Sequence, residues 1–278
     1  MKKIKAILFL FCVVSIFCAF KYVPPCTSCK NIEVSSDKGI YIFRIPAAGN
    51  YKLSPYVVEK LVYNEDVFKK TRAELVVNAG YFDAKNQQTT SYVVVDNNLA
   101  LDPELNKNLI GNENLKPHMK KILNRTEFRI LDCNGETRYD ISAHNARLPY
   151  RCKLRHSIQA GPLLYPDLRL KEEYFVVMKD GKIVRDAIFA YTKRPRTAIG
   201  IKNNDVYIIV ATNDRPLTLK ELASVCSDLQ LDKAMNFDGG GSTSVDYKGS
   251  DDAKFKNIHI VSDKNNMPRK LKSFLVVE

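Results

Sequence analysis

The chain has 278 residues, of which 45% are hydrophobic and 27% charged, a composition typical of a globular protein rather than of a disordered or fibrous chain. Its formal net charge of +12 suits an anionic substrate, an anionic envelope polymer or a solvated basic surface. Because no helix-turn-helix, zinc-finger or aromatic-basic RNA-binding pattern accompanies the charge, we expect no nucleic-acid partner.

The N-terminal segment has the pattern of an export signal. A basic stretch at 1–5 precedes an almost unbroken apolar run at 6–20. Cleavage after Ala19 would place the bulky Phe17 where a small residue is preferred. We therefore interpret residues 1–20 as either a signal peptide or a membrane anchor that attaches the chain through residues 6–20. In both cases we expect a periplasmic, cell-surface or secreted protein.

The cysteine pattern agrees with export, because an oxidising compartment permits disulfides. Cys133 and Cys152 bracket a loop-rich stretch and could pair, although the sequence leaves the pairing among the cysteines at 26, 29, 133 and 152 open. Cys26 and Cys29 are close enough for a local disulfide. Cys226 falls on the apolar face of a predicted helix, so we expect it to pack as a small hydrophobic side chain and not to act as a nucleophile.

The first half of the chain begins with a segment at 21–39 that we interpret as a tether, because it contains Pro, Ser and Lys without periodicity. A strand is predicted at 39–45. Ser54 and Pro55 are expected to open a helix, since Val58 and Leu61 follow at helical spacing. Short strands are predicted at 74–77 and 91–95.

Residues 102–126 are polar and are interpreted as an insertion or long excursion. Its cationic side chains are expected to be solvated, namely Lys116, Lys120, Lys121 and Arg125. A strand at 128–132 then turns at Asn134-Gly135, a dipeptide that strongly favours a hairpin.

The second half continues with predicted strands at 157–165, 196–201 and 205–210, the last two joined by a turn at Asn203-Asn204. Thr218 and Glu221 form a capping box and start a helix with one apolar face. Strands are predicted again at 245–247 and near the C-terminus. Strands thus outnumber helices, so we predict an α+β fold with extensive, mostly antiparallel sheet flanked by a few helices. Residues 40–278 are interpreted as a single domain.

Four segments carry candidate functional residues, and each also has a structural explanation. NAGYFD at 78–83 follows a buried strand, where loops position polar groups, but Asn and Gly also favour plain turns. QAGP at 159–162 holds a polar residue in an apolar run, and Gln159 either hydrogen-bonds structurally or faces a ligand. Arg196 heads an apolar strand, where it can bind a phosphate or carboxylate, or form a salt bridge at the rim.

The fourth segment, NFDGGGSTS at 236–244, contains three consecutive glycines. Glycine loses more backbone entropy on folding than other residues, so such a run implies positive φ or a close approach. Its N–H groups can form an anion-binding concavity beside Asp238. The alternative is a mobile turn between two strands. The spacing matches neither a Walker loop nor a dinucleotide fingerprint.

Together and in this order, the four motifs resemble the phosphodiester glycosidase family, over roughly residues 40–278. The resemblance implies one α+β domain with its motifs around one cleft, and cleavage of a sugar–phosphate bond in an N-acetylglucosamine-1-phosphodiester. Bacterial members are exported and often associated with surface polysaccharides. An anionic glycan or sugar phosphodiester is thus the expected partner.

The chemistry of cleaving such an anionic diester suggests roles for individual residues. Asp238 is expected to stabilise the oxocarbenium-like state at the anomeric carbon, with Asp83 as a second carboxylate that activates water. Arg196 is expected to hold the phosphate. Alternatively, Asp238 and Asp83 hold a divalent cation. The expected substrate-binding residues are Asn78, Gly80, Gln159, Gly161, Thr197, Gly239, Gly240, Gly241, Ser242 and Thr243.

Two other functions fit the same residues. A basic exported domain with this fold could bind an anionic envelope polysaccharide without cleaving it. A phosphodiesterase would break the P–O bond of the same substrate instead of the C–O bond. The products separate these alternatives: we take free sugar plus a phosphomonoester as the sign of a glycosidase and a sugar phosphate as the sign of a phosphodiesterase.

Overall fold

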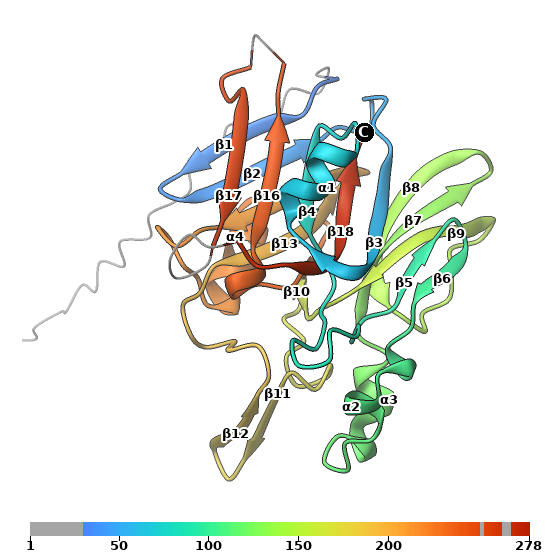
Figure 1. The fold of residues 1–278 in the computed structure, drawn as a ribbon, viewed down its shortest axis with the longest axis vertical. Helices are drawn as coiled ribbons and strands as arrows, with labels where there is room; N and C mark the ends of the chain where they lie inside the picture. The colour runs from blue at the N-terminus through green and yellow to red at the C-terminus, as the bar shows by residue number, and fades with distance from the viewer. Residues whose placement is uncertain (1–29, 251–252, 263–267) are drawn as a thin grey trace, which may run out of the picture.

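The structure is a computed structural model that describes residues 30–250, 253–262 and 268–278. The expected signal or anchor at 1–20 and the pair Cys26 and Cys29 lie outside the described residues. Every strand pairing in the described part of the chain is antiparallel, and four short helices accompany the sheets (Figure 1). The predicted α+β class with mostly antiparallel sheet is confirmed.

Three large sheets build the fold. The first has the order β1-β2-β14-β13-β15-β10, with the bounds β1 Glu33–Asp37, β2 Ile40–Ile45, β14 Asp205–Ala211, β13 Arg196–Lys202, β15 Lys233–Asn236 and β10 Leu163–Tyr165. The second has the order β17-β16-β4-β18-β3, with the bounds β17 Asn257–Val261, β16 Ser244–Lys248, β4 Leu75–Asn78, β18 Leu271–Val277 and β3 Leu53–Val62.

The third sheet has the order β6-β5-β9-β7-β8, with the bounds β6 Asn98–Leu101, β5 Val93–Val95, β9 Cys152–Gln159, β7 Thr126–Cys133 and β8 Glu136–Ala143. A separate hairpin pairs β11 (Val176–Lys179) with β12 (Lys182–Asp186). The α-helices are α1 Asn64–Lys70, α2 Lys107–Ile110, α3 Met119–Ile122 and α4 Leu219–Asp228. Short 3-10 turns are η1 Pro103–Leu105, η2 Lys116–His118 and η3 Gly240–Ser242.

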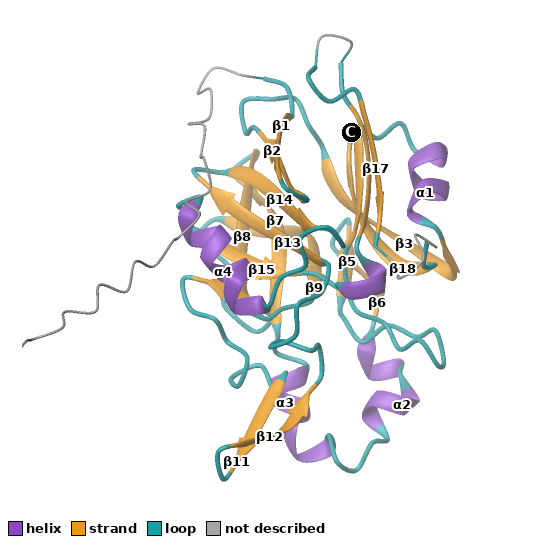
Figure 2. Ribbon diagram, turned by 90° about the vertical axis from the view of Figure 1, so that its left-hand side faces the viewer, coloured by secondary structure: helices purple, strands orange, loops and turns teal. Residues whose placement is uncertain are grey.

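One apolar core joins the three sheets, because it contains buried side chains from all of them, such as Ile208, Val77 and Phe128. Strand β14 is buried on both faces. Val206, Ile208 and Val210 face the shared core, whereas the alternate residues face a second core under α4. Helix α1 covers the outer face of the second sheet. Figure 2 shows α1 and α4 on opposite sides of the molecule.

Two expectations about the first strands are wrong. Residues 54–62 belong to strand β3 and not to a helix. Strand β3 lies at the edge of its sheet, where Pro55 is tolerated although it cannot donate a ladder hydrogen bond. Residues 33–37, inside the expected tether, form strand β1, and Ile32 before it is buried. The folded part of the chain therefore begins before residue 40.

Several local predictions are confirmed. Asn134-Gly135 connects β7 to β8, and Asn203-Asn204 connects β13 to β14. Helix α4 starts at the capping box of Thr218 and Glu221 and buries Cys226. Cys133 and Cys152 form a disulfide between directly opposite residues of β7 and β9. A disulfide fits an oxidising compartment. None of the described helices is long and apolar enough to cross a membrane.

Candidate active site

A cavity of about 320 Å³ lies where loops from the first and second sheets meet. Its walls come from the loop after β4, the loop between β12 and β13, the glycine run after β15 and the residues before β18. The glycine run leaves β15 in the first sheet and enters β16 in the second. Both sheets therefore hold the cavity in place, as rigid scaffolds hold functional loops in other proteins.

Asp238 lies half-buried in the cavity wall, directly after β15. Its backbone N–H donates to the Ala79 carbonyl at 2.8 Å, and its Oδ1 accepts from the Gly239 N–H at 2.9 Å. Burial raises the pKa of Asp238 to about 6, while hydrogen bonds from Ser242 and Gly239 and the charge of Arg269 act in the opposite direction. The carboxylate is therefore ionised at neutral pH but close to its titration range.

The three glycines allow close approach, as the sequence predicts, but they are only partly an anion cradle. Gly240 has a φ of +62°, a left-handed conformation that glycine adopts without strain. A Cβ on Gly241 would lie 3.5 Å from the Arg269 guanidinium. Two of the three N–H groups are already engaged, that of Gly239 by Asp238 and that of Gly240 by the Pro195 carbonyl at 2.8 Å.

Arg196 does not have the role that its position predicts. It is 2% exposed, and its guanidinium donates to the carbonyl oxygens of Leu217, Ile188, Phe189 and Thr192 at 2.6–3.0 Å. These bonds engage all three guanidinium nitrogens. Although Arg196 borders the cavity, its structural function is to hold the loop that forms one wall.

Two other arginines at the cavity keep their charge available, and the motif analysis missed both. The guanidinium of Arg194 lies over the Phe189 ring at 3.7 Å, and its Nε is a buried atom without a hydrogen-bond partner. Arg269 is exposed before β18, and its Nη1 lies 3.4 Å from the Ser242 hydroxyl. Within the described part of the chain, neither forms an ion pair. Arg194 belongs to the same basic run as Arg196, but no motif marks Arg269.

Asn236 and Tyr81 form a polar edge of the same cavity. The Asn236 amide nitrogen donates to the Tyr81 hydroxyl at 2.7 Å, and that hydroxyl donates to the Gly161 carbonyl at 2.9 Å. Asn236 Oδ1 is buried and has no partner among the described residues. Asn236 Oδ1 and Arg194 Nε therefore lie unpartnered inside the cavity wall, beneath the surface that a ligand can reach.

Asn78, Thr197 and Thr243 lie beneath the glycine run instead of facing the cavity. Asn78 donates to the Asp238 carbonyl at 2.6 Å and accepts from the Thr197 hydroxyl at 2.8 Å and the Ser244 N–H at 3.1 Å. The hydroxyls of Thr197 and Thr243 are 3.2 Å apart. This buried network fixes the backbone at Asp238, so these residues position the carboxylate but do not contact a ligand.

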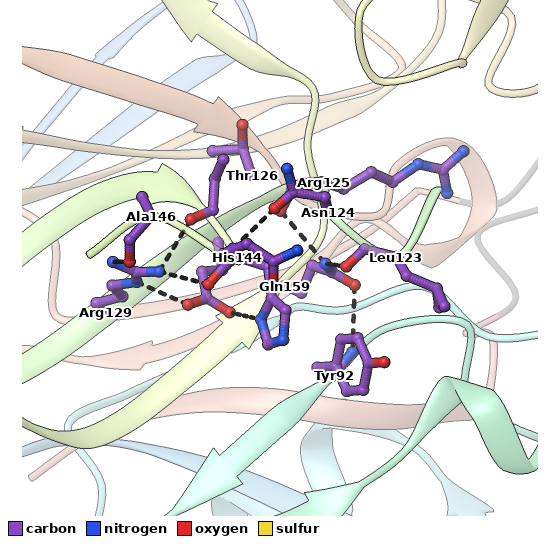
Figure 3. Close-up of polar contacts among 12 residues, drawn as sticks. Tyr92, Leu123, Asn124, Arg125, Thr126, Arg129, His144, Ala146 and Gln159 are labelled. Carbon is purple, nitrogen blue, oxygen red and sulfur yellow. Dashed lines mark hydrogen bonds and ion pairs between the residues drawn. The ribbon is translucent and has the colours of Figure 1, made fainter. Parts of the chain in front are cut away.

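Gln159, Gly80 and Gly161 are also structural. The Gln159 amide is 1% exposed and donates to the carbonyl oxygens of Leu123 and Arg125, as Figure 3 shows. The Gly80 N–H donates to the Ser273 hydroxyl at 3.0 Å. Gly161 has a φ of +83° and contributes its carbonyl to Tyr81. The structural explanation of Gln159 is therefore the correct one.

Asp83 is not part of the cavity wall. Its carboxylate accepts from the Lys85 N–H at 2.8 Å and the Asn108 amide at 2.9 Å, bonds that lower its pKa and hold a turn. The structure therefore gives no support for Asp83 as a second reacting carboxylate or as a cation ligand shared with Asp238. In the described ranges, no three His, Cys, Asp or Glu side chains gather as a metal site.

The fold resembles solved structures at low sequence identity. The catalytic domain of zebrafish N-acetylglucosamine-1-phosphodiester alpha-N-acetylglucosaminidase, auto-inhibited by its pro-peptide, is 16% identical with a TM-score of 0.61, and the match covers 94% of this chain and 86% of that chain. A hypothetical protein from Synechocystis is 13% identical with a TM-score of 0.56, covering 88% of this chain and 61% of that one.

A putative exported protein from Burkholderia pseudomallei K96243 is 14% identical with a TM-score of 0.52, covering 86% of this chain and 73% of its own. These likenesses establish the fold alone. No curated protein matches the chain in sequence. The sequence model of the phosphodiester glycosidases, however, matches residues 71–278, which include every segment that lines the cavity. The chain therefore belongs to the phosphodiester glycosidase family.

Proposed function

We propose that the protein is an exported glycosidase that hydrolyses the sugar–phosphate bond of an α-linked hexosamine-1-phosphodiester in an anionic surface glycan. The observation that carries this proposal is the cavity, where one carboxylate, Asp238, lies among the arginines 194, 196 and 269. The zebrafish relative is named for an N-acetylglucosamine-1-phosphodiester, which supports the same substrate class here.

The chemistry assigns a role to each unengaged group. Arg194 and Arg269 bind the phosphate, since guanidinium groups match phosphate oxygens in charge and geometry. Asp238 faces the anomeric carbon and stabilises the positive charge that develops as the C–O bond breaks. A phosphomonoester leaves more readily than a sugar alkoxide, so the reaction depends less on a general acid.

Product analysis in ¹⁸O-labelled water tests the proposal directly. An N-acetylglucosamine-1-phosphate diester should give free sugar that carries the label and an unlabelled phosphomonoester. A labelled phosphate product would identify a phosphodiesterase that cleaves the P–O bond. Tight binding of the polymer without any release of sugar would instead identify a non-catalytic binder of anionic envelope polysaccharide.

Asp238→Asn tests the assigned carboxylate, with Asp228→Asn on the exposed end of α4 as the matched control. We expect Asp238→Asn to lose at least a hundredfold in kcat, because the neutral amide no longer stabilises developing positive charge. The control should retain normal turnover. Full activity of a folded Asp238→Asn protein would overturn the role of Asp238.

The export part of the proposal rests on the N-terminal pattern and the Cys133–Cys152 disulfide. Expression of the full chain, cell fractionation and N-terminal sequencing would test it. A mature N-terminus beyond residue 19 would identify a cleaved signal, whereas an intact N-terminus in the membrane fraction would identify an anchor. Recovery in the cytosol with reduced cysteines would contradict export.

A further inference from the structure

Two arginines, Arg125 and Arg185, lie beside the cavity. Both contact the three residues that precede β11, namely Glu173, Tyr174 and Phe175. Arg125 packs its guanidinium 3.8 Å over the Phe175 ring, and its Nε donates to the Glu173 carbonyl at 3.1 Å. Arg185 lies 5.1 Å over the Tyr174 ring, and its Nε donates to the Tyr174 carbonyl at 3.3 Å.

Arg125 is buried and forms no salt bridge among the described residues, contrary to the expectation that it is solvated. It is 7% exposed, and among the described residues only its Nε has a hydrogen-bond partner. Its two Nη atoms have no hydrogen-bond partner among the described residues, but they are not fully buried, so solvent still reaches them. Figure 3 shows the side chain running away from the Gln159 amide. Burial lowers the pKa of Arg125 to about 10, and the charge of Arg185 adds to this shift, while Tyr81 and the charge of Glu173 oppose it.

Arg125 and Arg185 differ from the arginines with a structural role, whose guanidinium nitrogens are all engaged in hydrogen bonds. Arg129, in the neighbouring strand β7, donates from all three guanidinium nitrogens to the Glu127 carboxylate and three carbonyl oxygens, and Arg196 is similarly saturated. Within the described residues, neither Arg125 nor Arg185 forms an ion pair within 4 Å. The Glu173 carboxylate is occupied by Thr126 and the Leu163 N–H. A buried cation without a partner is unfavourable unless a ligand supplies one.

An aromatic pair completes the site. The His118 ring stacks on the Tyr174 ring with centroids 4.0 Å apart, and this contact joins η2 to the base of the β11–β12 hairpin. Tyr174 has a φ of +58°, a strained conformation for a bulky residue, and such strain is often found at binding sites. His118 and Tyr174 are both partly exposed, so the edges of this stacked pair lie beside the cations, an arrangement that suits sugars with anionic groups.

The second site adjoins the cavity through one ring contact. Phe175 lies under Arg125 and packs against Tyr81, with ring centroids 5.8 Å apart, and Tyr81 lines the cavity. The hairpin that starts beside Tyr174 returns to Phe189 in the cavity wall. In Figure 1, this hairpin and helices α2 and α3 project from the same side of the molecule.

We propose that Arg125, Arg185, Tyr174 and His118 form a second subsite that binds a further anionic group of the substrate, next along the glycan from the phosphate that is cleaved. The identity of the glycan rests on the proposed function, but the subsite itself rests on these contacts. The substrate class is then a polyanionic glycan with repeated phosphate or carboxylate groups, and not an isolated sugar phosphodiester.

Binding of inorganic polyphosphate tests the subsite without catalysis. Titration calorimetry on the full chain should show about tenfold weaker polyphosphate binding by Arg185→Gln and by Arg125→Gln, because each removes a charged phosphate contact. Arg138→Gln, an arginine that is 63% exposed on strand β8, is the matched control and should bind like the wild type. Unchanged affinity in a folded Arg185→Gln protein would overturn the subsite, even if Arg125→Gln fails to fold.

Kinetic measurements distinguish a failure of the proposed subsite from a failure of the proposed function. On a substrate with two anionic groups, Arg185→Gln should raise KM about tenfold and leave kcat unchanged. On a diester with one anionic group, the same variant should match the wild type. If polyphosphate binding depends on Arg185 but no diester is hydrolysed, the proposed function fails and the subsite stands. If hydrolysis occurs and Arg185→Gln has no effect on either substrate, the subsite is excluded.

Discussion

Asp238 is the residue whose environment most directly determines the chemistry. Burial raises its pKa to about 6, and only the ionised form stabilises positive charge at the anomeric carbon. We therefore expect kcat/KM to rise with pH and to reach half its plateau near pH 6. Ser242→Ala removes a hydrogen bond that lowers the pKa of Asp238. The rise of kcat/KM should therefore occur at higher pH in this variant. Profiles of kcat/KM against pH for the wild type and the variant measure this shift. Identical profiles would contradict the role assigned to Asp238.

The same pKa predicts a stability effect. Because the folded state holds the pKa of Asp238 above its ordinary value of 3.8, ionisation opposes folding, and stability falls as pH rises from about 4 through about 6. Asp238→Asn removes this dependence. The variant should be more stable than the wild type at pH 8 by about 1–3 kcal/mol, with little difference below pH 4. Urea denaturation at both pH values measures this, and equal stability at pH 8 would contradict it.

At the residue scale, the sequence pointed to the carboxylate that lines the cavity, Asp238, but not to the arginines that accompany it. A saturated arginine and a ligand-binding arginine look alike in a sequence, because the difference lies in which carbonyl groups the fold brings near. Arg196 meets four such carbonyls, whereas Arg194 retains an unpartnered Nε. Buried amides have the same ambiguity, so Asn78 and Gln159 were predicted as ligands although both support the backbone.

At the scale of elements, the disulfide joins two adjacent strands at a sequence separation of 19 residues. Closing such a loop restricts the unfolded chain, which in the chain-entropy model stabilises the fold by about 3 kcal/mol. The double change Cys133→Ser and Cys152→Ser should lower the free energy of unfolding by that amount without altering kcat, since the disulfide lies outside the cavity wall. Urea denaturation and turnover of the variant check both parts. A large loss of kcat would show that the third sheet influences the site.

Elements with strong local signals were predicted well. The Asn-Gly and Asn-Asn turns, the capping box of α4 and the alternating strands all follow from the preferences of a few neighbouring residues. Strand β3 was wrongly predicted as a helix, because Val58 and Leu61 also fit helical spacing. Only pairing with β18, more than 200 residues away, makes this segment extended. Strand β1 is likewise fixed by its pairing with β2.

At the scale of the whole molecule, the net charge of +12 should influence binding of an anionic substrate. We expect KM for a sugar phosphodiester to rise with ionic strength while kcat changes little, because salt screens attraction between separated charges more than contacts inside the cavity. Steady-state kinetics across a salt series measure this effect. Inhibition by an uncharged sugar is the control and should not depend on salt. A KM independent of salt would indicate that the basic surface is only solvated.

The overall fold class was predictable because it depends on counting strands against helices, which local patterns allow. The arrangement of those strands into three sheets was not predictable, since long-range pairings determine it. The same limit applies to the site. Four motifs indicated one cleft, but Arg269 joins it only because β18 enters the second sheet between β4 and β3.

The unpaired cations of the cavity also make the protein a sensor for its own substrate. Arg194 and Arg269 line the cavity and form no ion pair within the described residues, so an anion that binds both adds free energy to the folded state alone. A compound that binds only the native protein raises its melting temperature in proportion to the logarithm of its concentration. Thermal-shift screening of a sugar phosphate library can therefore rank substrates by how well they fill the cavity, before any reaction is detected.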